Sequence, residues 1–567
     1  MAVSRPAPPT HSPLPRLFLP CLIIFAAALA VRVAYARLLP VRVSADAAYY
    51  VMVAENLHHG RGFVSDYLWN YFAAPPLPTE LPVPSNEYWM PAQSVLTAAA
   101  FRLANSTSLR VAQAPSLLLG ALLCSLTAWI AGLLFRRRAA AWLAGLMSLV
   151  SFHLVGVSLY PDHFMLAACL VNLSLLALWA AWWNRPESSR ESAPPQHAHL
   201  KYQCLHCGRL VALSGLLAGL AYLTRNDGAL LGVAAAIPAI ALLRRGHLKR
   251  ALAFAASFCA CALLVILPWL LRQKLVFGSF WGAGALRTAF LTDYNDIFRL
   301  DLSQLNLHTY LQSSQTVALL FKGFVFYKGV HVLAAAVGLA GLLALWALFD
   351  RDLRGRAAPW LVYLGAALIV PAFVFPFPAI KGGFWHLMPG LCPIFFALAA
   401  GKGMQLIECG RRESRAAPRI AGWLALTLAL AYLLVWWKAA PREIASGEPP
   451  LYPLVAREAV LALDPSPRAV LTDSSWGLYH VAGVPCVQFP SDGAEAALQV
   501  ADRFGASYLI TQADAPDRLP AMDQIVNHPR FQPLARYPTP EGRLLVYRIL
   551  PRGAPQPPSD SRLRMSQ

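Results

Sequence analysis

Hydrophobic and polar positions alternate along the chain in long blocks rather than residue by residue. The apolar runs 21–31 and 251–271 belong to blocks long enough to cross a hydrocarbon core, which requires about 20 residues in an α-helix. Such blocks are typical of a polytopic α-helical membrane protein. We predict about eleven spans, near 17–38, 109–135, 139–159, 163–183, 210–224, 229–243, 250–271, 328–349, 358–376, 386–402 and 420–438.

Basic residues gather between the predicted spans. When the spans are threaded alternately, all the basic clusters fall on one side of the membrane, and Lys and Arg are in excess in cytoplasmic loops. We therefore predict that this side is the cytoplasm and that the N-terminus lies there. The first apolar block is too long for a cleaved signal peptide, so it is expected to remain as the first span. The clusters lie at 136–138, 184–209, 244–250, 351–356 and 411–419.

The same pattern predicts how the chain is divided. Beyond the last span, β-like runs alternate with a helix-like stretch, which is typical of a small α/β domain. The predicted parts are a disordered cytoplasmic N-terminus (1–16), a transmembrane module (17–440) with outer loops 39–108 and 272–327, an extracytoplasmic α/β domain (441–552) and a disordered tail (553–567).

Composition supports the membrane assignment and excludes nucleic acid as a partner. Of the 567 residues, 57% are hydrophobic and 14% are charged, whereas about a quarter of the residues are charged in a soluble domain. The net charge is +19, but from residue 441 onward the chain has 12 Lys and Arg against 13 Asp and Glu. The positive excess therefore lies in short clusters between spans and forms no nucleic-acid-binding face.

One polar segment follows the first span directly. It reads SADAAYYVMVAENLHHGRGF over residues 44–63, with Ser44 as a candidate N-cap and glycines at its end. Positions 46, 50, 53, 54 and 57 share one helical face, so we predict an amphipathic helix lying in the membrane interface, apolar face down. Asp46 is then at the helix N-terminus, where the dipole favours a carboxylate. The alternative is that Asp46 is only a first-turn capping acid.

This segment resembles the first outer loop of the GT-C glycosyltransferases. It is most similar to the branch that holds the protein O-mannosyltransferases of glycosyltransferase family 39 and the lipid A aminoarabinose transferases. Asn226 stands where the family has Pro in Thr-Arg-Pro-(Asp/Glu)-Gly. The resemblance covers roughly residues 17–440 and includes, in order, YWMP (88–91), LTRNDG (223–228), LPW (267–269), FG (277–278) and GFWHLMP (383–389).

The resemblance implies a membrane glycosyltransferase. The Ala- and Arg-rich composition favours a bacterial source, and the inner membrane and cell envelope are then the expected location and site of action. The donor would be a polyprenyl-phosphate-linked sugar, and the acceptor an extracytoplasmic lipid, glycan or protein. Transfer would invert the configuration at the anomeric carbon. Asp46 would be the general base, and Asp162 would assist it or orient the acceptor. The alternative for Asp162 is a helix cap after Pro161.

Cationic side chains would stabilise the departing phosphate. Three of the four candidates also have a simpler interpretation: a salt bridge with Asp227 for Arg225, and interfacial anchoring for Lys381 and His386. Tyr50 and Trp89 are candidates for substrate binding, or for ordinary packing. The donor-binding candidates are Arg225, Arg272, Lys381 and His386.

No cofactor is implied. A divalent cation is not supported by a paired acidic motif, because Asp46 is flanked by Ala45 and Ala47. Cys204 and Cys207, near two histidines, have metal-ligand residue types, but the second such cysteine pair of a zinc site is absent.

Two other functions remain open from the sequence. A transporter or flippase of lipid-linked glycans would show charges within spans, broken helices and inverted repeats, and no repeat is found. A catalytically inactive GT-C-like scaffold would keep the fold and lose the geometry around Asp46 and Arg225.

Overall fold

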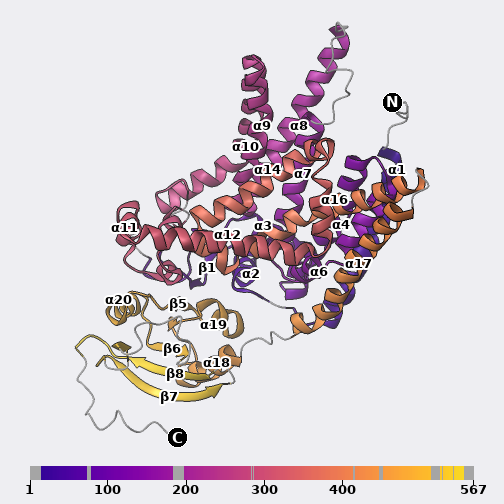
Figure 1. Cartoon of the computed structure of the whole chain (residues 1–567). Helices are drawn as coiled ribbons and strands as arrows, with labels where there is room; N and C mark the ends of the chain where they lie inside the picture. The colour runs from indigo at the N-terminus through magenta and orange to yellow at the C-terminus, as the bar shows by residue number, and fades with distance from the viewer. Residues whose placement is uncertain are drawn as a thin grey trace.

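The computed structural model of the chain describes residues 14–41, 43–72, 78–182, 197–281, 284, 286–412, 416–445, 451–512, 524–525, 528–539 and 542–553. The predicted disorder of the two ends therefore falls largely outside the described residues. Figure 1 shows a part made of long helices and a smaller α/β part beside it, with the N-terminus on the side away from the sheet.

Long apolar helices make up most of the structure. Among the described residues, ten helices are long and apolar enough to cross a membrane, or eleven if the bent pair α5 and α6 counts as one span. The predicted fold class, a polytopic helical protein with about eleven spans, is confirmed. The ten helices are α1 (Leu14–Leu38), α4 (Leu109–Phe135), α7 (Phe164–Trp182), α8 (His197–Thr224), α9 (Leu231–Arg244), α10 (Leu248–Phe277), α12 (Gln315–Val337), α14 (Arg351–Val374), α16 (Phe384–Arg412) and α17 (Ala416–Ala445). The bent pair is α5 (Arg138–Leu149) and α6 (Phe152–Ser158), and the short helix α13 (Ala340–Ala347) follows α12.

Two spans differ from the prediction. The span expected at 139–159 bends by 58° between α5 and α6, where Ser151 caps the new helix. The span expected at 328–349 is α12, which begins at residue 315 and shortens the predicted outer loop 272–327. Lys322 and Lys328 interrupt the apolar pattern there, but each ammonium lies over an aromatic ring, at 5.2 and 5.5 Å from its centroid.

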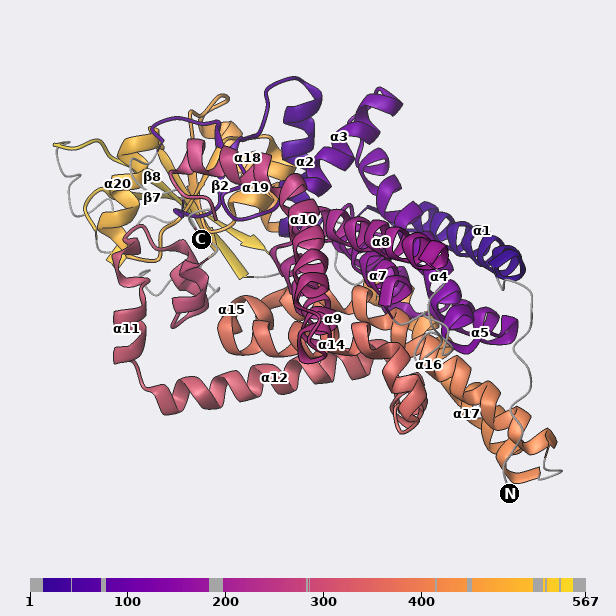
Figure 2. The ribbon, with the colours of Figure 1, turned by 90° about the horizontal axis from the view of Figure 1, so that it is seen from above.

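Short elements fill the two connections that the sequence predicts to be outer loops. Between α1 and α4 the chain forms α2 (Ala45–His58), β1 (Val64–Ser65), β2 (Tyr67–Leu68), β3 (Val83–Pro84) and α3 (Ala92–Ala104). Between α10 and α12 it forms η3 (Arg287–Phe290), η4 (Tyr294–Phe298), η5 (Leu302–Gln304) and α11 (Leu307–Gln312). Figures 1 and 2 show α1 and α11 at opposite ends of the helical part. Three short turns, η2 (Asn226–Leu230), α15 (Pro376–Pro378) and η6 (Ala379–Gly383), join long helices.

The α/β part has one six-stranded sheet in the order β2-β5-β4-β6-β8-β7. Strands β2, β5, β4 and β6 are parallel, and β8 and β7 are antiparallel to their neighbours. The C-terminal elements are α18 (Leu451–Leu463), β4 (Val470–Thr472), α19 (Ser475–Ala482), β5 (Cys486–Gln488), α20 (Ala494–Phe504), β6 (Tyr508–Gln512), β7 (Phe531–Thr539) and β8 (Gly542–Ile549).

The edge strand β2 belongs to the connection between α1 and α4, not to the C-terminal segment. Tyr67 pairs with Cys486 and Leu68 with Val487. Helix α20 packs on one face of the sheet, and α18 and α19 pack on the other face together with α2. The connection between α1 and α4 therefore supplies a strand and a covering helix to the α/β part.

Helix α2 is buried on all sides, which corrects the prediction of an interfacial helix with its apolar face toward lipid. All residues from 47 to 54 are buried. Tyr49, Tyr50 and Val53 pack against the sheet, whereas Val51 packs against α3. An apolar helical face needs an apolar partner, and its period does not say whether that partner is lipid or protein. Figure 1 shows α2 between the two parts of the chain.

Helices α8 and α10 approach closely at two glycines spaced four residues apart. A Cβ at Gly215 would overlap the carbonyl oxygen of Phe258, and one at Gly219 would lie 2.7 Å from the carbonyl oxygen of Ala262. Small residues at this spacing let helix backbones meet in a membrane. The two helices therefore depend on glycine at both positions.

Gly215→Ala is expected to lower the thermal unfolding midpoint in detergent, because the new methyl group meets backbone rather than a movable side chain. Gly208→Ala on the same helix is the matched control, since a Cβ there meets nothing within 4 Å. The control should be neutral or slightly stabilising, because Ala is a better helix former than Gly by about 1 kcal/mol. Equal midpoints for the two variants would contradict the close approach.

Candidate active site

Asp46 lies in the first turn of α2, but it does not cap the helix. The cap is Ser44, whose Oγ accepts a hydrogen bond from the backbone N–H of Ala47 at 3.1 Å. Asp46 Oδ1 instead accepts a hydrogen bond from Trp89 Nε1 at 3.0 Å, and Oδ2 lies 3.8 Å from His386 Nδ1. The carboxylate therefore points away from its own helix, toward groups from distant parts of the chain.

A second carboxylate, Asp162, lies in the connection between α6 and α7 and is fully buried. Ser44 Oγ donates a hydrogen bond to Asp162 Oδ2 at 3.0 Å, and the backbone N–H of His163 donates to Oδ1 at 2.7 Å. Ser116 on α4 donates to the main-chain carbonyl oxygen of Asp162 at 3.3 Å. Ser44 thus caps α2 and also ties its N-terminus to the second carboxylate.

Arg225 follows α8 and is held by two partners. Its Nε and Nη2 donate to the carboxylate of Asp227, at 3.0 and 2.7 Å, and its Nη1 lies 2.6 Å from His163 Nε2. Since guanidinium can only donate, His163 Nε2 must accept, and the ring proton is on Nδ1, which faces the Asp162 carboxylate. The contacts engage three of the five N–H groups of Arg225.

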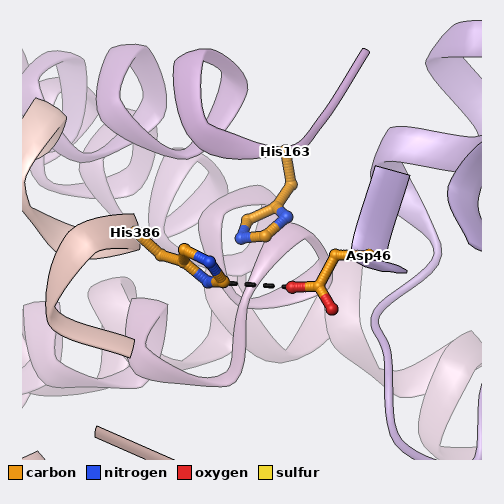
Figure 3. Close-up of side chains that lie close together, drawn as sticks. All are labelled: Asp46, His163 and His386. Carbon is orange, nitrogen blue, oxygen red and sulfur yellow. Dashed lines mark ion pairs between the residues drawn. The ribbon is translucent and has the colours of Figure 1, made fainter. Parts of the chain in front are cut away.

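His386 reaches the site from the first turn of α16. Its ring centroid is 5.1 Å from that of His163. The preceding turn η6 has Gly382 at φ +156°, and a Cβ at that glycine would lie 3.3 Å from His386 Nε2. A side chain at position 382 would therefore crowd the imidazole. Figure 3 shows His386, His163 and Asp46 pointing toward one another from three separate segments.

A small cavity continues from these groups into the helical part. Its volume is about 10 Å³, which holds about one water molecule. Arg225, Asp227, Tyr363 and His386 line its polar side, and apolar residues and glycines of α7, α8, η2 and α16 line the rest.

Burial shifts the proton affinity of the acids and of His163. It raises the pKa of Asp46 above its ordinary 3.8; the nearby Asp162 charge raises it further, whereas His163, Trp89 and Arg225 lower it. Burial also raises the pKa of Asp162. Burial and then Arg225 lower the pKa of His163 to about 3, so this imidazole is neutral at physiological pH. The site therefore combines two carboxylates of raised basicity with a neutral imidazole and a guanidinium.

The structure places the other predicted site residues at different distances from Asp46. Tyr50 is buried, and its ring centroid is 5.3 Å from that of His163. Lys381, on η6, has its Nζ 5.3 Å from the centroid of the Tyr294 ring. Arg272 belongs to another cluster, where it donates to the carbonyl oxygen of Phe63 at 3.3 Å and faces Glu87.

Sequence reasoning missed three features of this site. They are the second role of Ser44, the part taken by His163, and the buried carboxyl group of Glu87. The signal for His163 was its place beside Asp162. Glu87 stands two residues before Trp89, in a segment singled out only for its aromatic residues.

Asp46, His163 and His386 could each offer one ligand atom to a metal ion, and these atoms lie within 4.8 Å of one another. One carboxylate and two imidazoles are a donor set that zinc accepts. Both ring nitrogens of His163 already face partners, so ligation by His163 would displace Arg225 or Asp162. Of the cysteine and histidine cluster that the sequence singles out, Cys207 is described and partly buried, whereas the side chains of His197, His199 and Cys204 lie outside the described residues.

Comparison by sequence gives no relatives, since no family model and no curated protein matches the chain. Comparison by structure finds solved proteins of the same fold. The archaeal oligosaccharyltransferase AglB from Archaeoglobus fulgidus, in complex with an inhibitory peptide and a dolichol-phosphate, matches with a TM-score of 0.56 at 15% identity. The match covers 94% of this chain and 75% of that chain.

ArnT from Cupriavidus metallidurans, bound to undecaprenyl phosphate, matches with a TM-score of 0.54 at 14% identity and covers 94% of this chain and 98% of that chain. The A. fulgidus oligosaccharyltransferase tethered with an acceptor peptide matches with a TM-score of 0.57 at 15% identity, over 94% and 74% of the two chains. These matches extend over nearly the whole chain. The chain therefore has the GT-C fold, in an integral membrane protein.

Proposed function

We propose that the protein is a membrane glycosyltransferase that moves a sugar from a polyprenyl-phosphate-linked donor to an acceptor outside the cytoplasm, with Asp46 as the general base. The observation that carries this proposal is the position of the Asp46 carboxylate, which is turned away from α2 toward Trp89, His386 and the Asp162–His163–Arg225 group. The solved structures of the same fold that bind dolichol-phosphate and undecaprenyl phosphate support the choice of donor.

The proposed reaction is a single displacement. A hydroxyl of the acceptor attacks the anomeric carbon, the bond from that carbon to the phosphate oxygen breaks, and configuration inverts. The acceptor's proton passes to Asp46, whose raised pKa makes it a stronger base than an ordinary aspartate. Asp162 accepts a hydrogen bond from Ser44, the N-cap of α2. Asp162 therefore fixes the N-terminus of α2 and keeps Asp46 in place.

The leaving phosphate gains negative charge that cations must stabilise. Arg225 is the first candidate, because Asp227 fixes its orientation and two of its N–H groups are outside the contacts described above. Lys381, on η6, would serve next as a second cation, and His386, in the first turn of α16, could donate an N–H hydrogen bond to the phosphate. Arg272 is proposed to reach only a distal part of the donor, since its own contacts are elsewhere.

No cofactor enters the proposed reaction, and Tyr50 and Trp89 are proposed to line the substrate site. The transferred sugar is proposed to be a hexose or pentose, as in mannosyltransferase-like members of the resembling branch. The acceptor is a lipid, glycan or protein of the cell envelope.

We place the protein in a bacterial inner membrane with the N-terminus in the cytoplasm. The basic clusters between the spans support this orientation. The α/β part, which lies on the side away from the N-terminus, would then be extracytoplasmic.

The test uses the full-length protein in membranes that contain the native acceptors, with a panel of radiolabelled polyprenyl-phosphate sugars. Label from one donor should move from the lipid-soluble fraction into an acceptor, with inverted configuration in the product. If no donor yields a covalent product, the transfer proposal is wrong.

The runner-up is a flippase of lipid-linked glycans. Arg32 within α1 is fully buried, its Nε and Nη2 have no hydrogen-bond partner among the described residues, and α5 and α6 form a bent span. Charges inside spans and broken helices are common in transporters. In proteoliposomes, a flippase would move labelled lipid between leaflets without transferring the sugar, which separates the two functions.

The pH profile gives a further prediction. Because Asp46 must be unprotonated to act, transfer should fall as pH is lowered, and it should do so above the ordinary carboxyl value of 3.8. Asp162→Asn removes the neighbouring negative charge that raises the pKa of Asp46. The acid limb of the pH profile, that is, the fall of transfer activity at low pH, should therefore move to lower pH. An acid limb that stays in place, or that moves upward, would contradict the coupling of the two carboxylates.

A further inference from the structure

Glu87 is a buried carboxyl group that the proposed reaction does not use. It lies between β3 and α3 and is 8% exposed. The charged and titratable groups that face it are the guanidinium of Arg272 on α10, the phenol of Tyr49 on α2 and the phenol of Tyr67 on β2; the neutral amide of Asn70 also faces it. A buried carboxylate costs free energy unless it has such partners.

Tyr49 connects Glu87 with the site. The backbone N–H of Asn86 donates a hydrogen bond to Tyr49 Oη at 2.6 Å. A hydroxyl has one proton to donate, and this proton remains for the carboxylate of Glu87 beside it. The orientation of the Tyr49 ring is thus set at its hydroxyl by the turn that carries Glu87.

The ring of Tyr49 in turn holds Trp89. The two rings stack with centroids 4.0 Å apart and an interplanar angle of 29°. Trp89 Nε1 then donates its hydrogen bond to Asp46 Oδ1. Tyr49 and Asp46 are both on α2, and Glu87 and Trp89 are both on the turn before α3, so the four side chains form a closed set of contacts between two segments.

The backbone of that turn is also fixed. Asn86 has φ +68°, its Nδ2 donates to the carbonyl oxygen of Trp89 at 3.1 Å, and Gln273 of α10 donates to the carbonyl oxygen of Asn86 at 2.6 Å. Because the backbone of the turn is fixed, the Trp89 ring can move only if its stacking contact with Tyr49 changes.

We propose that Glu87 is a positioning residue: it holds the Tyr49 hydroxyl, Tyr49 holds the Trp89 ring, and Trp89 holds the Asp46 carboxylate in the orientation in which it takes a proton. Only the last step rests on the proposed function. Activity would then depend on Glu87 and Tyr49, which do not take part in the reaction themselves. Arg272, which faces Glu87, connects these residues to α10.

The ionisation of Glu87 gives this arrangement a pH dependence. Burial raises the pKa of Glu87 from 4.5 to about 7, against the opposing effects of its own backbone N–H and of Arg272. The ionised carboxylate accepts the Tyr49 proton more strongly than the neutral acid does. The contacts around Trp89 should therefore be firm above pH 7 and weaken as pH falls through that value.

The kinetic test is a double-mutant cycle with Glu87→Gln and Tyr49→Phe in the full-length protein. Each change should lower kcat by about tenfold, a coupling typical of residues in contact, and leave the KM for the lipid donor unchanged. The double variant should lose no more than either single one, and Glu87→Asp should recover part of the loss. Additive losses, or a change in KM alone, would overturn the proposal.

A second readout does not depend on transfer. In protein labelled with fluorotryptophan, the ¹⁹F signal of Trp89 is assigned by its absence in Trp89→Phe. This signal should shift with a midpoint near pH 7 in the wild type and in Asp46→Asn, and should not titrate there in Glu87→Gln. The same titration in Glu87→Gln would overturn the proposal. If the signal behaves as expected but the wild type transfers no sugar, the positioning contacts stand and the proposed function is wrong.

Discussion

Asp46→Asn, in full-length protein at equal expression, is expected to lower sugar transfer by about 10²–10⁴-fold, which is the usual contribution of a general base. Asn has the size of Asp and can still accept the hydrogen bond from Trp89 through its carbonyl oxygen. It cannot take a proton from an attacking hydroxyl. The loss should therefore appear in kcat, with donor binding largely kept, and is measured with the donor that the wild type uses.

The matched control is Glu55→Gln. Glu55 lies on the same helix, and the change replaces a carboxylate by an amide in the same way, but its side chain lies outside the group around Asp46. This variant should transfer as the wild type does. If Asp46→Asn also keeps its activity, the base lies elsewhere, and Asp162, which is buried beside His163, is the next residue to replace.

The span pattern could be predicted because the length and apolar character of a membrane helix are visible in a run of consecutive residues. That information is local, and so is the cap of α2, since Ser44 stands two residues before Asp46. The prediction was least accurate where a helix is interrupted. The lysines of α12 and the bend between α5 and α6 break the apolar pattern, although the chain continues as helix on both sides.

Contacts between distant segments could not be predicted in this way. Strand β2 has two residues, too few for any strand pattern, and its partner β5 lies more than 400 residues later in the chain. The same holds for the burial of α2, whose covering residues come from α18, α19 and the sheet. Without knowledge of those partners, an apolar helical face after a span is naturally assigned to lipid.

The candidate site could be predicted only in part, because local sequence patterns indicate where a residue lies along the chain but not which distant residues it contacts. Placing Asp46, Asp162, Arg225 and His386 on one side of the membrane follows from the threading of the spans, but their mutual contacts do not. The sequence gives no sign that Arg225 meets His163 across 62 residues. Nor does it indicate that Arg272 turns to Glu87 and so leaves the group around Asp46.

Arg225→Gln is expected to lower transfer by about 10²–10³-fold, which is the loss usual for removing one preorganised donor to a developing anion. The guanidinium is fixed by Asp227 and contacts His163, so its charge requires no rearrangement when the phosphate leaves. Its removal also takes away a positive charge that lowers the pKa of Asp46. The acid limb of the pH profile should consequently move to higher pH, a change that simple misfolding would not produce.

The competing interpretation is that Arg225 serves only to pair with Asp227, and the double variant Arg225→Gln with Asp227→Asn separates the two roles. Arg225→Gln alone leaves Asp227 without its cation and should lower the thermal unfolding midpoint, whereas removing both charges should restore it. If Arg225 stabilises the leaving phosphate, transfer stays low in the restored double variant, and Arg225→Lys recovers only part of it because lysine lacks the planar fork. Full transfer by the double variant would instead make the ion pair the whole role of Arg225, and the phosphate would need Lys381 or His386 as its principal partner.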